Sequence, residues 1–363
     1  MSSLDEKRKK INEIDKKMAQ LFEERMEVSK EIALFKKENA LPILDSLREK
    51  EILASHQNDM SDVIVQEYYI SFLKELMNIS KRYQSRIIEG IKVGYTGVEG
   101  AFGQIAASKI FTNGKYISYP SFTSAYEAVE KGECDVCVLP LENSYAGDVG
   151  EVMDLIFSGS LYINEVSELV IEHNLLGKET ASEDKIKTVM SHPQALQQCS
   201  EYIEKMHFNT IEYPNTAMAS LDLAKSNDDT VGVIASKESA SLYNLKILKE
   251  HIQTNHNNST RFAVFSRSLR KPSAASKMGE HFILVFTVLN EAGSLAKTLN
   301  IIGSHGFNMR NLRSRPMKSL MWNYYFFVEL EGNINSQDGK DMLNELKTVC
   351  DCLKLVGTYT EHI

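Results

Sequence analysis

The sequence predicts a multidomain protein in which an all-α segment is followed by an α/β segment and then by a smaller α+β segment. The first observation is that none of the 19 glycines precedes Gly90, and only Pro42 interrupts residues 1–89. The second is a change of hydrophobic period near Ile91, where short apolar runs begin to alternate with helical stretches. The third is a final stretch that follows the order βαββαβ.

Three domains are therefore expected. A chain of 363 residues is also longer than the usual length of a domain with a single hydrophobic core. Their boundaries are expected at residues 1–89, 91–268 and 278–363. The polar stretch SLRKPSAASK, residues 268–277, is expected to link the second domain to the third.

Composition places the chain among ordinary globular proteins and disfavours several classes of partner. It is 43% hydrophobic and 25% charged, and its net charge of −8 argues against nucleic acid or an anionic membrane as the main partner. The start MSSLDEKRKK has no apolar signal core, and no apolar run is long enough to span a bilayer, so a cytoplasmic protein is expected. Cys134 and Cys137 form a CxxC within an apolar run and are expected to be buried thiols rather than metal ligands.

The all-α segment begins with one continuous apolar stripe over residues 4–37. The stripe consists of Leu4, Ile11, Ile14, Met18, Leu21, Val28, Ile32 and Phe35. This heptad spacing predicts one helix of about 50 Å, at a rise of roughly 1.5 Å per residue. A shorter helix over residues 43–56 and a second long helix over residues 61–88 are expected to follow.

Polar residues interrupt the packing faces of these helices. Arg25 stands on the apolar stripe, where an unpaired charge would be costly. Lys36 shares its angular direction, and Ser80 and Gln84 lie one turn apart on the third helix. Two explanations are open: an internal network of ion pairs, or a pocket for a small, doubly anionic ligand.

The complete set favours the pocket, because residues 4–88 resemble the all-helical chorismate mutase family. The matching positions are Arg8, Arg25, Lys36, Asp45, Arg48, Glu49, Ser80 and Gln84. The resemblance implies rearrangement of chorismate to prephenate, with neither a metal nor an organic cofactor. It implies that Arg25 and Arg48 bind or orient carboxylates. It also implies that Lys36 and Gln84 donate to the ether oxygen, and that Asp45 and Glu49 hold the ring hydroxyl.

Arg8 and Arg25 stand too far apart to serve one small ligand from one straight helix. They are separated by 17 residues, or about 25 Å at the helical rise. Arg8 must therefore reach the site of another subunit, and a dimer with composite sites is expected.

Four motifs stand out in the α/β segment: GVEGAF (97–102), PLENSxxGxV (140–149), SHPQALQQC (191–199) and NSTRF (258–262). Glycines 97, 100 and 103 are spaced GxxGxxG, which is not the dinucleotide-binding GxGxxG. Each motif has a structural explanation when taken singly. Ser191 could cap a helix that begins at Pro193, and Glu142 with Arg261 could be a plain ion pair.

Jointly and in this order, the motifs resemble the prephenate dehydratase domain, despite departures at Ala101 and Gly103. The resemblance implies a two-lobed α/β cleft like that of type II periplasmic binding proteins. It also implies loss of carbon dioxide and water from prephenate to give phenylpyruvate. Thr260 would contact the leaving hydroxyl as a donor, and Arg261 would bind a carboxylate or brace the loop. The other candidate residues are Asn143, Ser144, Ser191 and Gln198, which would orient the substrate, and Glu142, which could stand behind them.

The final segment carries AGSLAKTL (292–299) and NLRSRP (311–316) on a ferredoxin-like pattern without a clustered acid–base pair. These motifs resemble the regulatory ACT domain, which implies feedback inhibition by phenylalanine bound at a subunit interface. The candidate contacts are Gly293, Ser294, Leu295, Asn308, Leu312 and Ser314. Arg313 stands where the family usually has an acidic residue.

The best interpretation is one bifunctional enzyme of phenylalanine synthesis, assembled as a homodimer or a dimer of dimers. Three alternative functions are open: an arogenate dehydratase, a mutase fused to prephenate dehydrogenase, and a non-catalytic amino-acid-binding regulator. The dehydrogenase would need the GxGxxG that is missing. A pure regulator would have no need for the mutase residues.

Overall fold

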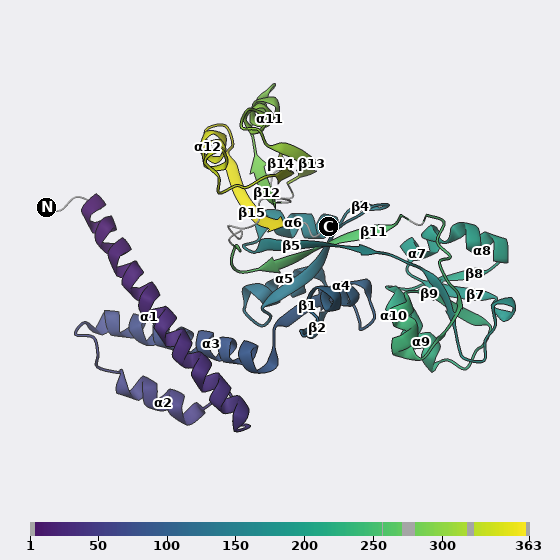
Figure 1. The fold of residues 1–363 in the computed structure, drawn as a ribbon, viewed down its shortest axis with the longest axis horizontal. Coiled ribbons are helices and arrows are strands. Elements are labelled where there is room, and N and C mark those ends of the chain that lie inside the picture. The colour runs from purple at the N-terminus through teal and green to yellow at the C-terminus, as the bar shows by residue number, and fades with distance from the viewer. Residues whose placement is uncertain (1–3, 256, 271–279, 318–322, 361–363) are drawn as a thin grey trace. The chain divides into compact units, whose positions relative to one another are not determined.

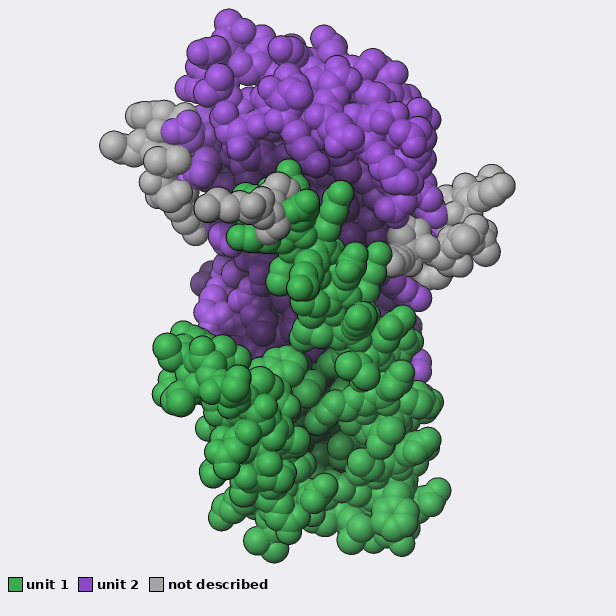
Figure 2. Space-filling model, turned by 90° about the vertical axis from the view of Figure 1, so that its left-hand side faces the viewer, with its two compact units in different colours: residues 1–91 green, residues 92–363 purple. Residues whose placement is uncertain are grey.

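The computed structural model describes residues 4–255, 257–270, 280–317 and 323–360, and the chain forms two compact units (Figures 1 and 2). The first unit is residues 1–91 and the second is residues 92–363. The all-α segment is thus one unit, whereas the other two segments share the second. No helix among the described residues is long and apolar enough to cross a membrane.

The first unit consists of three helices, α1 (Leu4–Glu38), α2 (Ser46–Ser55) and α3 (Val63–Glu89). The helices expected from the glycine distribution are confirmed. The side chains of Asp45 and Asp62 cap the N-termini of α2 and α3 by accepting from backbone amides. Gly90 ends α3 with a φ of 88°, a conformation that glycine adopts without a steric penalty.

This unit has little core of its own. Among its described residues, the buried apolar side chains are Ala33, Leu73 and Met77. The apolar stripe of α1 is exposed in the single chain, with Leu4 at 62% and Leu21 at 64% exposure. Three helices with so small a core are marginal on their own.

The second unit begins with one lobe of a mixed sheet, in which the strand order is β5–β11–β3–β1–β2 and β4 pairs with β3. The last strand of this lobe, β11, comes from a distant part of the sequence and lies antiparallel between β3 and β5. The elements are β1 (Lys92–Thr96), α4 (Phe102–Ile110), β2 (Lys115–Tyr119), α5 (Phe122–Glu130), β3 (Val136–Asn143), β4 (Gly147–Asp148), α6 (Gly150–Ser158), β5 (Tyr162–Val170) and β11 (Ser259–Ser266).

A second lobe is inserted between β5 and β11, so the chain passes from one lobe to the other twice (Figure 1). Its five-stranded sheet has the order β10–β6–β9–β7–β8. The elements are β6 (Asn174–Gly177), a short 3₁₀ turn (Glu183–Lys185), β7 (Thr188–Ser191), α7 (Pro193–Gln198), α8 (Ser200–Met206), β8 (Asn209–Glu212), α9 (Thr216–Lys225), β9 (Val231–Ala235), α10 (Lys237–Tyr243) and β10 (Lys246–Lys249). The expected two-lobed α/β architecture is therefore present.

The C-terminal segment has the expected order βαββαβ. Its antiparallel strands lie in the order β13–β14–β12–β15, which is the ferredoxin-like arrangement. Strand β15 also pairs in parallel with β5 of the first lobe, so the two sheets are joined edge to edge. The elements are β12 (Glu280–Thr287), α11 (Ser294–Ser304), β13 (Asn308–Pro316), β14 (Tyr324–Glu331), α12 (Gln337–Leu346) and β15 (Cys352–Thr360).

This sheet buries both of its faces. Phe282, Leu284 and Phe286 of β12 pack with the helices of the segment, whereas Ile283 and Val285 pack into the core of the first lobe. Alternate residues of a strand point to opposite faces, so one strand serves two cores. The C-terminal segment thus packs against the first lobe through a shared hydrophobic core.

One local expectation needs correction. Ser191 does not cap α7, because the cap is His192, whose ring accepts from the amide of Gln194. Cys134 and Cys137 are buried free thiols, as expected; Cys137 lies on β3 and Cys134 shortly before it. The expected linker of residues 268–277 lies largely outside the described residues.

Gly357 is expected to be required where β15 meets β5. A Cβ at this position would collide with the carbonyl oxygen of Ile163, whereas a Cβ on Gly303 of α11 would meet nothing within 4 Å. Gly357→Ala should therefore destabilise the second unit by about 1–3 kcal/mol. The matched Gly303→Ala should be neutral or stabilise by about 0.5–1 kcal/mol. Urea unfolding of both variants checks this, and equal midpoints would contradict it.

Candidate active sites

In the helical unit, the structure joins Arg25 of α1 to Ser80 of α3. An Nη of Arg25 donates to Ser80 Oγ, and Ser80 in turn donates to the carbonyl of Leu76 at 3.0 Å. Burial lowers the pKa of Arg25. Close by on α3, Gln84 is buried, and its Oε1 has no hydrogen-bond partner. Of the polar groups that the sequence predicted on packing faces, Ser80 and Gln84 are thus buried and Arg25 is partly buried.

The remaining predicted residues of this unit lie at its periphery. Lys36 Nζ donates to the carbonyl of Ile43 at 2.6 Å, and Glu49 pairs with Lys81 at 2.8 Å. Asp45 accepts from the amide of Arg48 at 3.0 Å, while the Arg48 side chain is exposed and pairs with Glu51. Arg8 lies near the other end of the unbroken α1, where it is exposed and pairs with Asp5.

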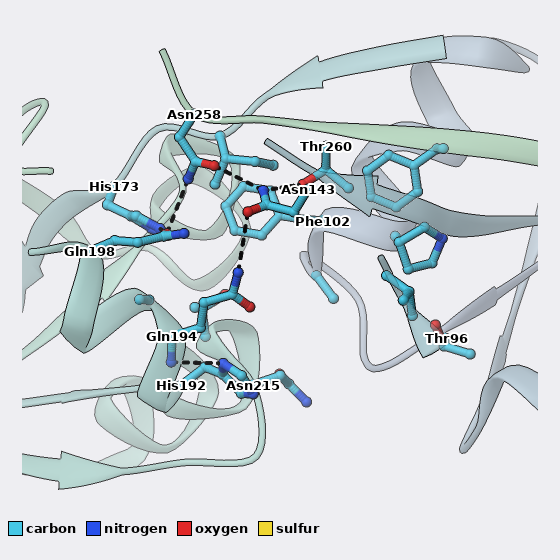
Figure 3. Close-up of a pocket in the computed structure, with 18 of the residues that line it drawn as sticks. Thr96, Phe102, Asn143, His173, His192, Gln194, Gln198, Asn215, Asn258 and Thr260 are labelled. Carbon is cyan, nitrogen blue, oxygen red and sulfur yellow. Dashed lines mark hydrogen bonds between the residues drawn. The ribbon is translucent and has the colours of Figure 1, made fainter. Parts of the chain in front are cut away.

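In the second unit, residues of both lobes line a cavity of about 370 Å³ (Figure 3). The polar lining consists of Thr96, Asn143, His173, His192, Gln194, Gln198, Asn215, Thr216, Asn258 and Thr260. No described residue of this lining is an aspartate, glutamate, lysine or arginine. Any anion in the cavity would therefore be held by neutral donors and backbone amides.

Asn143, at the end of β3, organises one wall of the cavity. Its Oδ1 accepts from the backbone amides of Tyr145 at 3.1 Å and Ala146 at 2.9 Å, which identifies its other terminal atom as the NH₂ group. That Nδ2 lies 2.9 Å from Thr260 Oγ1 and 2.8 Å from Asn258 Oδ1. Because Thr260 accepts from Asn143, its own hydroxyl proton is available to a ligand.

Glu142 and Arg261 lie on the other side of the same two strands, away from the cavity. Arg261 donates to Glu142 at 2.6 Å, to Glu329 of β14 at 2.7 Å and to the Tyr359 hydroxyl at 2.9 Å. Burial alone would raise the pKa of Glu329, but the hydrogen bonds from Arg261 outweigh it and hold that pKa below its usual value. Arg313 of β13 also pairs with Glu142. Of the two roles open to Arg261, bracing is the one that these contacts describe.

Ser144 and Ser191 hydrogen-bond to the backbone and do not line the cavity. Ser144 Oγ accepts from the amide of Ser259 at 3.0 Å, and Ser191 is fully buried and donates to the carbonyl of Ile234 at 2.6 Å. The predicted residues that do line the cavity are Asn143, Gln198 and Thr260.

Sequence reasoning missed several lining residues, notably His173 and Asn258. Asn258 is the first residue of the motif NSTRF, so its membership of that motif was a usable signal. His173 stands alone just after β5, and nothing in its neighbourhood in the sequence marks it.

In the C-terminal segment, the candidate effector residues lie around the start of α11 and along the edge strand β13. Gly293 begins α11 with a φ of 88°, and Ser294 and Leu295 form its first turn. Leu312 and Ser314 are exposed and pair with Val328 and Phe326, on the face that the helices cover. Asn308, at the start of β13, donates to Glu331 at 2.9 Å. Arg313 points to the opposite face, toward the first lobe.

The chain matches two family models, chorismate mutase type II over residues 7–85 and prephenate dehydratase over residues 93–270. Two similar relatives, from Buchnera aphidicola and Aquifex aeolicus, are both bifunctional chorismate mutase/prephenate dehydratases. The first is 31% identical over 97% of this chain and 95% of the relative. The second is 32% identical over 100% of this chain and 99% of the relative.

Solved structures share the fold of the second unit. Prephenate dehydratase from Arthrobacter aurescens in complex with L-Phe has a TM-score of 0.69 at 22% identity, over 75% of this chain and 90% of that one. A protein described as GqqA, a quorum quenching acylase, also has a TM-score of 0.69, at 24% identity over 75% of this chain and 98% of that one. At this level of identity, the structural similarity supports the fold assignment alone.

Proposed function

The chain belongs to the family of bifunctional chorismate mutase/prephenate dehydratases and carries both activities, and we propose that each unit holds one of its reaction sites. Chorismate would rearrange to prephenate at the pocket that contains Arg25 and Gln84. Prephenate would then lose carbon dioxide and water in the cavity between the two lobes.

For the dehydration, the carrying observation is the hydrogen bond from Asn143 Nδ2 to Thr260 Oγ1. With its lone pair engaged, the Thr260 hydroxyl donates to the ring hydroxyl of prephenate. As the C–CO₂ bond breaks, its electrons enter the ring, the C–O bond breaks, and the hydroxyl takes up a proton and leaves as water. Threonine is too weak an acid to supply that proton in bulk, so Thr260 stabilises the departing oxygen or relays a proton to it. Aromatisation supplies the driving force.

Thr260→Ala should abolish phenylpyruvate formation and leave prephenate formation from chorismate intact, because the two reactions use different units. Thr260→Ser, which keeps the hydroxyl, is the matched control and should retain much of the dehydratase rate. Loss of one donor to a developing charge costs roughly 10²–10³-fold in kcat. Turnover assays with chorismate and with prephenate measure both steps. Equal loss of both activities in Thr260→Ala would contradict the two-site assignment.

For the mutase reaction, we propose that the helical unit works as a dimer with composite sites. The rearrangement needs no nucleophile, so the protein's task is to hold a compact conformer and stabilise charge on the ether oxygen. Arg25 and Arg48 would bind carboxylates, Lys36 and Gln84 would donate to the ether oxygen, and Asp45, Glu49 and Ser80 would complete the pocket.

Two observations support the dimer. α1 is one unbroken helix of 35 residues, so Arg8 stands about 25 Å from Arg25 along its axis. The apolar stripe of the same helix is exposed in the single chain. A second copy laid along α1 would cover the stripe and bring its Arg8 to the pocket.

Mixing Arg8→Ala with Arg25→Ala chains should restore mutase activity, because a mixed dimer contains one pocket without either substitution. If chains mix at random, about half of the dimers are mixed, so the mixture should recover roughly a quarter of the wild-type sites. Chorismate consumption after mixing and refolding measures this. Activity no higher than that of either parent would contradict composite sites.

We also propose that the C-terminal segment is an ACT domain through which phenylalanine inhibits the dehydratase. Two features support a site that a second copy would complete. The segment has a ferredoxin-like fold, and Gly293, Leu312 and Ser314 lie near the exposed edge strand β13, on the side of the sheet where the helices pack. Glu329 and Arg313 contact Arg261 and Glu142, the neighbours of Thr260 and Asn143 in sequence. Binding at the edge would reach the cavity through these ion pairs.

Arg313→Ala should leave phenylalanine binding largely intact and weaken its inhibition of the dehydratase several-fold. The reason is that Arg313 faces the first lobe rather than the effector edge. Isothermal titration measures binding, prephenate turnover measures inhibition, and thermal melting controls for the fold of the second unit. If wild-type protein gave no phenylalanine heat and no change in activity, the segment would be a dimerising fold without an effector.

A further inference from the structure

A chain of side-chain amides along the cavity wall has a direction that hydrogen bonding fixes at every link (Figure 3). It starts at Asn143, whose Oδ1 accepts from two backbone amides and whose Nδ2 must therefore donate. Its acceptors are Asn258 Oδ1 at 2.8 Å, the carbonyl of Ser259 at 2.9 Å and Thr260 Oγ1 at 2.9 Å. Asn258 consequently presents its Nδ2 on its other side.

The next link fixes Gln198. Asn258 Nδ2 donates to Gln198 Oε1 at 3.1 Å, so that oxygen is an acceptor. His173 Nε2 lies 2.8 Å from the same oxygen and can only donate to it. The neutral imidazole therefore carries its proton on Nε2. Burial of His173 lowers its pKa, which favours this neutral form.

Gln198 is left with its amide nitrogen unpartnered. Gln198 and His173 are both at least nine-tenths buried and line the cavity, and Gln198 Nε2 has no acceptor among the residues that the structure describes. A buried donor without an acceptor is unfavourable, so this nitrogen calls for an acceptor from outside the protein, which a ligand or an ordered water can supply. The cavity lining has no described cation, which leaves neutral donors of this kind to bind an anion.

We propose that Asn258 and His173 are positioning residues for the dehydration, because they hold Gln198 with its NH₂ group toward the substrate. Gln198 then donates to a carboxylate oxygen of prephenate. A flipped amide would instead present its carbonyl oxygen to the carboxylate and repel it. This inference rests on the proposed placement of prephenate in the cavity.

The first test reverses the middle link. Asn258→Asp keeps the shape of the side chain but replaces its donor with an acceptor, so Gln198 loses a bond that fixes its orientation. The KM for prephenate should rise roughly ten- to hundredfold, the range expected for loss of a hydrogen bond to a charged group, with a smaller change in kcat. Asn257→Asp, one residue away and exposed, adds the same charge outside the chain of amides and should change KM less than twofold.

The second test separates positioning from chemistry at His173. Glutamine can place its amide nitrogen where the imidazole places Nε2, so His173→Gln keeps the donor to Gln198, whereas His173→Leu removes it. His173→Leu should raise KM at least tenfold more than His173→Gln does. Equal impairment of the two variants would mean that the imidazole ring itself is needed, and would overturn a purely positioning role.

The third test uses pH. In Gln198→Glu, one carboxylate oxygen still accepts from Asn258 and His173, which leaves the other oxygen facing the substrate. Below the pKa of this glutamate, that oxygen is protonated and can donate. Above it, the charge repels prephenate, so KM should climb with pH far more steeply than in the wild type. A pH profile parallel to that of the wild type would overturn the proposal.

Chorismate mutase turnover of every variant reports on the helical unit, and thermal melting reports on the fold of the second unit. If wild-type protein converts prephenate and Thr260→Ala does not, a wild-type KM in Asn258→Asp defeats this inference alone. If wild-type protein fails to convert prephenate, the proposed function falls instead.

Discussion

The pairing of β11 between β3 and β5 is the constraint on which the second unit depends. Along β11, alternate residues point to opposite faces. Asn258 and Thr260 therefore face the cavity, and Arg261 faces the C-terminal sheet. The register sets Thr260 opposite Asn143 and Arg261 opposite Glu142. One strand pair thus carries cavity-lining side chains on one face and the ionic contacts with the C-terminal segment on the other.

This arrangement separates charge from the cavity. The partly buried ion pairs of Arg261 with Glu142 and Glu329 lie on the far side of the sheet, where they join the lobe to β14. The cavity keeps amide, hydroxyl and imidazole groups, together with the first turns of α4 and α9. Helix N-termini favour anions, so a doubly anionic substrate can be bound without a lining arginine. A neutral amide can bind an anion only when its NH₂ group, and not its carbonyl oxygen, faces that anion. The direction of the amide chain matters for this reason.

The helical unit meets a different constraint, because its helices are too few to bury their own apolar surface. The length that puts Arg8 beyond reach of Arg25 also extends the exposed stripe along α1. A single feature, one long helix without glycine, therefore supports both the shared mutase site and the dimer that would form it. In the same unit, Arg25 is already held by Ser80, so part of the pocket is ordered within one chain.

The sequence by itself determined the elements of the fold and the chemistry of the motifs. Glycine placement marked the helices, the change of period marked the α/β part, and the motifs contained Asn143, Gln198 and Thr260, which the structure brings to one cavity. Only the tertiary structure decided which motif residues face that cavity. Ser144 and Ser191 bond to the backbone, and Glu142 and Arg261 face the other way, because strand register rather than motif membership sets orientation. His173 lies between β5 and β6, and only the fold brings it to the cavity. Its hydrogen bond to Gln198 belongs to a series that begins at two backbone amides beside Asn143, and no spacing in the sequence encodes the direction of that series.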